Sequence, residues 1–458
     1  MHRKNKGGKR KNAVQSIPVV NPKVAGVDIS STELWVCGPA RADREVNVRV
    51  FSVTTPQLHA LADWLQEQQV ESVAMESTSV YWIPLYEVLE AKGFEVLLVN
   101  ARQLRHVPGR KTDMQDCQWL QLLHSCGLLR GSFRPQESIC CLRALNRQLA
   151  NLVAERSKAV QWMQKALDQM NVLVHRAVSD LSGVTGMAIV RAIVEGERDP
   201  RKLAELRDKR CRKSVDQIAE YLTGTWREEH VFNLRSALVL YDHLNQQIVT
   251  YEEKIQDEIR ALQPPERRDQ PVDAPTNPVK HKSMKRLGEL EMRADLCRFA
   301  GVDLTAIDGI SVGTARVILT EVGIDMCAFP SQKDFVSWLR LSPRTPISGG
   351  KPVNKRNNGF GATRVAATLR MAALTLRRSN TALGASYRRI ARRKSGKVAV
   401  FATARRLAEI VYRMLRFGHD YVDIGAQAYE DRFRHRKLTV LSASADQLGY
   451  ILVAKPVS

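Results

Sequence analysis

The order of the apolar segments between residues 24 and 125 restricts the possible folds of this chain more than any other feature of its sequence. Three strand-like segments come first, and segments with helical and strand spacing then alternate. Strands are expected at 24–30, 33–38, 46–53, 70–75 and 93–99, and helices at 57–69, 80–91 and 114–126. Three strands followed by helix, strand, helix, strand and helix predict an α/β domain of the RNase H/RuvC-like type.

Two long apolar seams follow this domain. Apolar residues alternately three and four positions apart run from Leu142 to Leu173, with Arg156 as the one misfit. A second seam runs from Ala237 to Leu262. The seams predict a helical coiled-coil region, and they fit an antiparallel arm within one chain as well as a dimerisation arm.

Composition sets the remaining boundaries, and the second half of the chain has mostly helical spacing. A polar segment with several prolines is the clearest linker. The expected parts are a basic disordered tail at 1–20, an RNase H/RuvC-like domain at 21–135, a coiled-coil region at 136–262, a Pro-rich linker at 263–284, a helical domain at 285–425, and a C-terminal tail at 426–458.

Charge points to a polyanionic partner. The chain has 70 Lys and Arg against 48 Asp and Glu, a net charge of +22, which favours nucleic acid. No acidic residue occurs from Phe335 to Ala408. Within that stretch, nucleic-acid contacts are expected from Arg388, Arg389, Arg392 and Arg393.

Membrane, secreted and zinc-binding proteins are disfavoured. No apolar run approaches the roughly 20 residues of a membrane-spanning helix, and no long apolar segment follows the basic N-terminus. The eight cysteines form no CxxC pair. We therefore expect a cytoplasmic protein with reduced thiols and no membrane partner.

Four carboxylates occupy notable places in the expected α/β domain. Asp28 lies inside an apolar strand, where an unpaired carboxylate is unfavourable, and Glu76 ends another strand. Asp113 and Asp116 share one face at the start of a helix. Asp113 alone could be a helix cap, and Asp28 alone could flank a turn. Together the four predict a Mg²⁺ site, because hard oxygen ligands suit that ion.

The same residues carry a resemblance to a known family. The motifs GVDIS, MESTSVYW and GRKTDMQDC resemble the N-terminal blocks of DEDD-type transposases and recombinases of bacterial insertion sequences, the insertion-sequence family one-ten, which is Piv-invertase-like. The resemblance covers roughly residues 24–180. It implies that Asp28, Glu76, Asp113 and Asp116 are the catalytic, metal-binding tetrad.

The sequence departs from the family pattern at several positions. Ser79 replaces the usual Gly, and Cys117 replaces the usual Ala after the last Asp. Ser30 and Ser31 stand where a Lys is common. None of these departures removes a carboxylate, so they bear on local loop geometry.

The C-terminal half has two further motifs. Residues 307–319 look like a helix-hairpin-helix element, in which a Gly turn leads to a helix whose N-terminal amides can face a phosphate; an ordinary packing corner fits equally well. The sequence then continues to a Ser-Gly-Gly loop that contains Ser348. Ser342 is the nearby rival, but it precedes Pro343 and lacks the Gly-Gly context.

The block at 302–376 resembles the second domain of the same family. The resemblance implies that the helical domain at 285–425 binds DNA and that its Ser348 is the nucleophile that becomes covalently joined to DNA. Three basic residues near it would position the nucleic-acid backbone, namely Arg344, Lys351 and Lys355.

These patterns predict a DNA transposase that cleaves and rejoins strands of a mobile element. Its partners would be donor and target DNA and, by resemblance, a structured noncoding guide RNA. We also expect a homo-oligomer, a dimer or a tetramer. One alternative is a RuvC-like metal-dependent junction nuclease, against which the Ser-Gly-Gly loop argues. The other is a catalytically silent nucleic-acid-binding protein, against which the four carboxylates argue.

Overall fold

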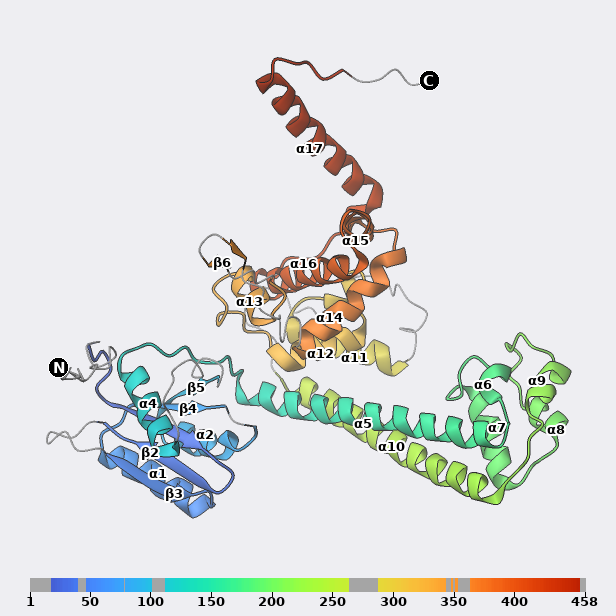
Figure 1. Ribbon diagram of the computed structural model, residues 1–458, viewed down its shortest axis with the longest axis horizontal. Helices are drawn as coiled ribbons and strands as arrows, with labels where there is room; N and C mark the ends of the chain where they lie inside the picture. The colour runs from blue at the N-terminus through green and yellow to red at the C-terminus, as the bar shows by residue number, and fades with distance from the viewer. Residues whose placement is uncertain are drawn as a thin grey trace, which may run out of the picture. The chain divides into compact units, whose positions relative to one another are not determined.

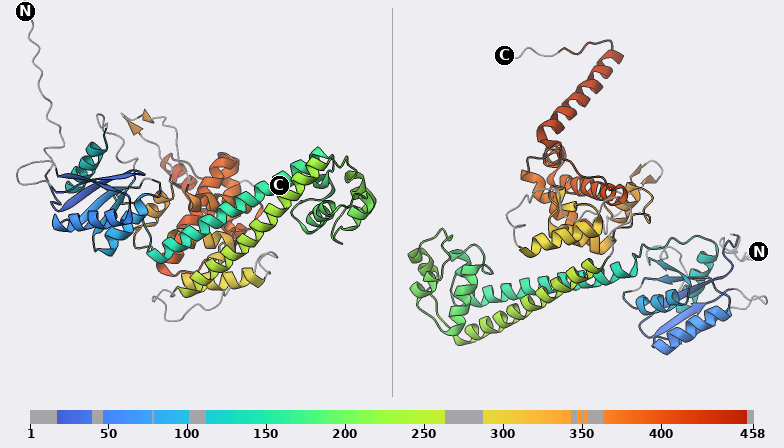
Figure 2. Two further views of the ribbon diagram at one scale, coloured as in Figure 1. Left: turned by 90° about the horizontal axis from the view of Figure 1, so that it is seen from below. Right: turned by 180° about the vertical axis from the view of Figure 1, so that it is seen from behind.

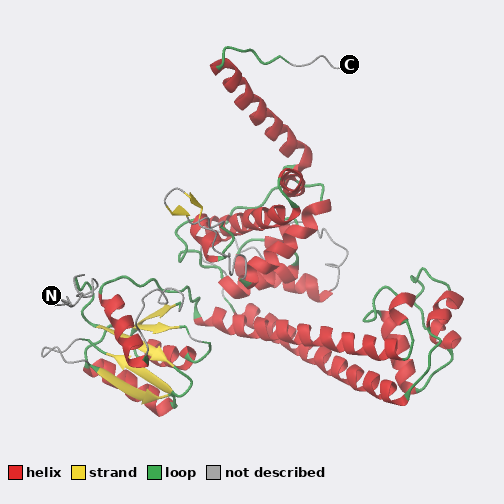
Figure 3. Cartoon of the chain, in the orientation of Figure 1, coloured by secondary structure: helices red, strands yellow, loops and turns green. Residues whose placement is uncertain are grey.

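A computed structural model describes most of the 458-residue chain. The described residues are 18–39, 47–77, 79–100, 112–262, 287–342, 347–348, 351–352 and 363–453. The chain divides into two compact units, Met1–Arg134 and Pro135–Ser458, and each is described by itself. The first is α/β and the second is mostly helical (Figure 3), which confirms the predicted α/β-plus-α layout.

A five-stranded mixed sheet forms the centre of the first unit (Figure 1), with the order β3-β2-β1-β4-β5. The first three strands pair antiparallel, and β4 pairs parallel with both β1 and β5. The strands are β1 (Val24–Ile29), β2 (Glu33–Cys37), β3 (Val48–Ser52), β4 (Ser72–Glu76) and β5 (Glu95–Val99). Each lies within two residues of the bounds expected from the sequence.

Among the described residues, three helices cover this sheet: α1 (Thr55–Glu67), α2 (Trp82–Ala91) and α4 (Asp113–Ser125). The apolar residues of α1 and α2 share one core with alternate residues of β1 and β4, such as Val27 and Met75. On the opposite face, Leu120 of α4 packs against Ala74 of β4. The sheet is therefore the middle of three layers, and α4 covers the face that carries the carboxylates.

Two long antiparallel helices begin the second unit (Figure 2). They are α5 (Glu137–Gln169) and α10 (Glu228–Ala261), which pack along one another within the chain. The misfit Arg156 donates a hydrogen bond from Nη1 to Asn245 Oδ1 across the pair, at 2.9 Å. Four short helices lie at the far end of this arm: α6 (Val174–Ala177), α7 (Val184–Glu195), α8 (Pro200–Glu205) and α9 (Val215–Tyr221).

One detail of the seam prediction is wrong. The first seam was expected to continue to Leu173, but α5 ends at Gln169 and Leu173 precedes α6. The backbone leaves the helix at Asn171, whose φ of 55° lies in the left-handed region. Of the two seam residues past the helix end, Met170 belongs to the core at the tip of the arm, whereas Leu173 is only half-buried.

The rest of the second unit is a helical body packed around α16. Its elements are α11 (Leu287–Ala300), η3 (Leu304–Ala306), α12 (Val312–Val322), α13 (Gln332–Trp338), β6 (Ile347–Ser348), β7 (Lys351–Pro352), α14 (Arg364–Thr375), η4 (Leu376–Arg378), α15 (Ala382–Arg393), α16 (Gly396–Phe417) and α17 (Gly425–Gln447). Arg298 of α11 donates hydrogen bonds to the last carbonyls of α10, those of Ile259, Arg260 and Leu262. It thereby caps the arm helix against the body.

The last helix stands apart from this body. None of the residues of α17 is buried, and its packing partner is α15 (Figures 1 and 2). Among the described residues, no helix combines the length and the apolar character needed to cross a membrane.

Candidate active site

Strand alternation places two of the four carboxylates on the face of the sheet that α4 covers. Val27 pairs with Met75, and both belong to the core on the opposite face. Because successive strand residues point to opposite faces, the next residues, Asp28 and Glu76, point towards α4. Both are half-buried.

The other two carboxylates lie in the first turn of α4. Thr112 is the N-cap, and its side chain accepts a hydrogen bond from the Gln115 amide at 3.4 Å. The start of a helix is a favourable place for negative charge, which offsets part of the repulsion between Asp113 and Asp116.

Gly26 sets how closely α4 approaches β1. A Cβ built on Gly26 would lie 2.3 Å from the Gln121 amide nitrogen and 2.5 Å from the Cys117 carbonyl oxygen. Both atoms belong to the backbone of α4, so no rotamer change can make room. Only glycine permits this approach, and the approach brings Asp113 and Asp116 towards the end of β1.

The electrostatics of Asp28 show that the four carboxylates are neighbours. Burial first, and then the charges of Asp113, Asp116 and Glu76, raise the pKa of Asp28 from 3.8 to about 6. A site that gathers four acids is suited to a cation. In the portion of the chain that is described, however, no three Asp, Glu, His or Cys side chains converge tightly enough to hold a metal ion.

Two family departures have local structural roles here. Ser79 has a φ of 51° in the left-handed region, which glycine adopts without strain. Cys117 is fully buried beneath β1, and its pKa is raised to about 12 by burial, with Cys37 and Asp28 adding to the effect. It is therefore a packing residue with an unreactive thiol.

Ser348 lies in the second unit, at the end of β6. Its backbone pairs with that of Lys351 in the two-stranded sheet. Arg344 and Lys355 lie outside the described residues. The helix that follows, α14, begins at an N-cap, Thr363, whose hydroxyl also donates to the Leu339 carbonyl at 3.3 Å. The end of α13 and the start of α14 are thus held together.

Of the two interpretations of residues 307–319, the structure favours a packing corner over a phosphate-binding helix-hairpin-helix element. Gly309 has a φ of 86°, and a Cβ there would lie 2.9 Å from the Ala372 carbonyl oxygen of α14. The start of α12 borders a pocket that also contains acidic residues of α10 and α11. Arg316 pairs with Glu252 across it, at 3.4 Å. This acidic surrounding disfavours a phosphate at the start of α12.

The four arginines of α15 divide into two pairs. Arg388 donates to the Ser379 carbonyl at 2.6 Å. Arg389 lies over the rings of Tyr429 and Phe433 of α17. Arg392 and Arg393 are exposed. The structure therefore leaves the second pair facing solvent, while the first pair contacts protein.

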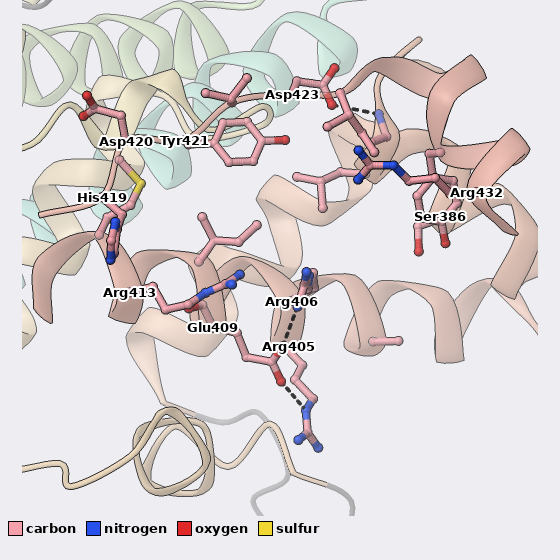
Figure 4. A pocket seen from close by; sticks show the side chains of 18 residues that line it. Ser386, Arg405, Arg406, Glu409, Arg413, His419, Asp420, Tyr421, Asp423 and Arg432 are labelled. Atoms are coloured by element: carbon pink, nitrogen blue, oxygen red, sulfur yellow. Dashed lines mark hydrogen bonds and ion pairs between the residues drawn. The ribbon is translucent and has the colours of Figure 1, made fainter. Parts of the chain in front are cut away.

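A pocket of about 780 Å³ opens between α15, α16 and the segment that leads into α17 (Figure 4). Its charges are mixed and largely satisfied within the protein. Glu409 accepts hydrogen bonds from Arg405 at 3.0 Å and from Arg406 at 3.2 Å. Asp423 accepts one from the Ala382 amide at the start of α15. The first two contacts lie within α16, and the third ties the 418–424 segment to the start of α15.

A buried carboxylate that the sequence did not single out joins the arm to the body. Glu321 of α12 is 5% exposed and accepts two hydrogen bonds from Arg147 of α5, at 2.9 and 2.8 Å. Arg143 lies 3.5 Å and Arg364 3.9 Å from the same carboxylate. Arg147 and Glu321 are 174 positions apart, so local spacing gives no signal of this contact.

Comparison with known families identifies matches in both units. A DEDD transposase model of the IS110 type, described as "Transposase", matches residues 25–172. A second, described as "Transposase IS116/IS110/IS902 family", matches residues 301–388. Together these matches cover more than half of the chain and include the carboxylates and Ser348. No curated protein matches the chain.

Proposed function

The chain belongs to the IS110 family of DEDD transposases, and on that premise we propose how it cleaves and rejoins DNA. In this proposal the first unit is an RNase H/RuvC-like domain whose tetrad is Asp28, Glu76, Asp113 and Asp116. Ser348 of the second unit supplies the nucleophile. The products are strands of a mobile element joined to new partners.

The clustering of the carboxylates carries this proposal. Three acids from β4 and α4 contribute to the raised pKa of Asp28 in β1. Four carboxylates held this close together repel one another. Carboxylates with pKa values perturbed in this way are typical of functional sites. The strand order of the first unit, three antiparallel strands followed by two parallel ones, supports the RNase H/RuvC-like assignment.

Transposases of the DEDD type normally use a divalent metal, and we propose Mg²⁺ for this chain. The donor set fits, since all four side chains offer hard oxygen ligands. When bound, the ion would neutralise charge on the reacting phosphate. Asp28 and Glu76 are fixed by strand pairing, with Trp35 and Val99 respectively, and Asp113 and Asp116 by the packing of α4 on Gly26.

The serine step exchanges one phosphate ester for another. Ser348 Oγ attacks a backbone phosphorus and loses its proton to a base. A serine–phosphate ester forms, and the bond to the leaving strand breaks to release a hydroxyl end. Attack on that ester by the hydroxyl of a second strand restores Ser348 and joins the strands, so the diester is conserved without ATP. Lys351, opposite Ser348 in β6–β7, and Arg344 and Lys355 are proposed to contact the DNA backbone.

A guide RNA and self-association complete the proposal. Base pairing by a structured noncoding RNA would select the DNA sequence, while the protein recognises shape and backbone. The net charge of +22 supports a large nucleic-acid partner. Exposed apolar side chains on the arm, including Trp162, Phe232 and Val239, support a dimer or tetramer formed through this region.

The test is a cleavage assay analysed under denaturing conditions. Ser348→Ala should abolish both cutting and covalent protein–DNA attachment, whereas the matched control Ser342→Ala should retain both. Ala variants at each tetrad position should lose cutting while keeping DNA affinity. If Ser348→Ala still produces free DNA ends, the chain is a metal-dependent hydrolase. Cleavage that persists in chelator would refute the role of the tetrad.

A further inference from the structure

A groove between α15 and α17 has features that the proposed chemistry does not use. Its volume is about 600 Å³. Apolar side chains from both helices line it, namely Ile390, Phe433 and Val440. The cations along it are Arg393 of α15 and Arg436 and Lys437 of α17, with Arg389 beside the aromatic ring.

The charge of this groove is of one sign. Among its described lining residues there is no acid and no side-chain hydrogen-bond acceptor. The pocket in Figure 4 differs, because Glu409, Asp420 and Asp423 line it together with arginines. A groove that combines cations with an apolar floor is complementary to a ligand that has both negative charge and flat apolar surfaces.

The aromatic ring on the floor is held in place. Arg389 lies 3.8 Å from the centroid of Phe433 and 4.8 Å from that of Tyr429. Since α17 buries none of its own residues, these stacked contacts are part of what holds it against α15. Phe433 remains 38% exposed, so part of its ring is available to a ligand.

We propose that this groove binds unpaired DNA, with bases against Phe433 and phosphates against Arg393, Arg436 and Lys437. Stacked bases in a duplex cannot offer their faces to an aromatic side chain, whereas unpaired bases can. The 2′-hydroxyl of RNA both donates and accepts hydrogen bonds, and the charged lining side chains, which are all donors, offer its proton no acceptor. The groove would hold a strand that is unpaired during exchange.

The inference rests on the proposed function for the identity of the nucleic acid, but it is tested separately. Neither the tetrad nor Ser348 takes part in binding at the groove. A tetrad Ala variant, inactive in cleavage, should therefore bind unpaired DNA as the parent does. If the protein cleaves DNA but does not bind unpaired DNA at the groove, the groove proposal fails and the proposed function stands. If it binds at the groove but does not cleave, the proposed function fails and the groove proposal stands.

The first experiment measures affinity of the full chain for a thymidine oligonucleotide of about 12 nucleotides, within the usual range of ~4–16 for such sites. Replacing Arg393, Arg436 and Lys437 with Ala should flatten the dependence of log affinity on log salt by about 2, since each contact with a single strand contributes ~0.7. Arg434→Ala is the matched control, because Arg434 is exposed on the same helix and outside the groove. An unchanged slope in the triple variant, or an equal change per residue in the control, overturns the proposal.

The second experiment tests stacking directly. An oligonucleotide that contains 5-iodouracil should crosslink to Phe433 on irradiation, and the crosslinked peptide is identified by mass spectrometry. Phe433→Leu should weaken binding about tenfold, while Phe433→Trp, which keeps an aromatic face, should retain binding. Thermal unfolding of both variants shows whether α17 stays folded. Equal affinity of Phe433→Leu and Phe433→Trp overturns the stacking role.

Competitors decide the class of ligand. Unpaired DNA should displace the probe better than the same sequence as a duplex, and RNA should gain no advantage over DNA. Stronger binding of RNA, or equal displacement by polyglutamate, overturns the assignment, because the groove would then recognise the ribose or charge alone.

Discussion

Helix α4 lies close against β1 at Gly26, and Gly26→Ala should separate the two halves of the proposed tetrad. The added Cβ would lie 2.3 Å from the Gln121 nitrogen and 2.9 Å from Leu120 Cβ. Real Cβ contacts are seldom shorter than about 3.4 Å, so α4 must retreat by roughly 1 Å. Overpacking of this kind destabilises a protein by about 1–3 kcal/mol.

The functional loss should exceed the loss of stability. Asp113 and Asp116 move with α4, while Asp28 stays on β1. A displacement of about 1 Å in a catalytic constellation can lower the rate by roughly 100-fold. The expected result is a chain that is still folded at 25 °C, has faster hydrogen exchange in α4 and β1, and has lost most of its cleavage activity.

Gly288→Ala is the matched control. Nothing lies within 4 Å of a Cβ at Gly288, so the same substitution there should leave exchange and cleavage unchanged. Hydrogen exchange by mass spectrometry and the cleavage rate are measured on all three proteins. If Gly26→Ala shows parental exchange in α4 and parental cleavage, the close approach does not set the geometry of the site.

Four further perturbations test other parts of the structure. Ser79→Gly should raise the unfolding free energy by about 0.5–1 kcal/mol in urea titration, because it relieves a left-handed backbone; a decrease would contradict this. Burial lowers the pKa of His124, whose Nε2 lies 2.9 Å from Ser72 Oγ. The unfolded chain therefore takes up that proton first, and stability should fall as the pH drops through about 6.5; His124→Gln should flatten this dependence of Tm on pH. Glu321→Gln should destabilise the second unit by about 2 kcal/mol in urea, through loss of charged hydrogen bonds, and an unchanged midpoint would argue against the junction. Leu149→Ser, at a position 2% exposed, should lower the unfolding free energy by about 3 kcal/mol and reduce the helical circular dichroism signal. Parental values of both quantities would show that the seam is not buried.

The elements of the first unit could be predicted because their signals are local. Strand alternation and helical spacing are properties of about ten consecutive residues, and both gave bounds close to those observed. The faces of Asp28 and Glu76 follow from the same alternation. What the sequence could not supply was the distance between β1 and α4, which depends on the absence of a side chain at Gly26.

The arm shows a different limit. The two seams indicated which residues of α5 and α10 would be apolar, but the same pattern fits pairing within a chain and between chains. The choice depends on whether the four short helices between them allow the chain to turn back, and they do. The Arg156–Asn245 hydrogen bond then explains the misfit, since a polar pair within an apolar seam is compatible with only one register.

The basic stretch from Phe335 to Ala408 shows that charge along the sequence predicts nucleic-acid contacts less well than charge on the folded surface. An acid-free run of this length predicts a phosphate-bearing partner, but it does not say which arginines face that partner. Arg388 satisfies the Ser379 carbonyl, and Arg389 lies against two aromatic rings that come from α17, beyond the end of the run. A guanidinium suits such positions because it is planar and more weakly hydrated than an ammonium group.

The arginines that remain exposed, Arg392 and Arg393, occur one turn further along α15. Arg393 shares a groove with cations that the sequence places more than forty residues away. The nucleic-acid surface that we propose is therefore assembled from two helices, and the part that comes from α15 is defined only once α17 is in place.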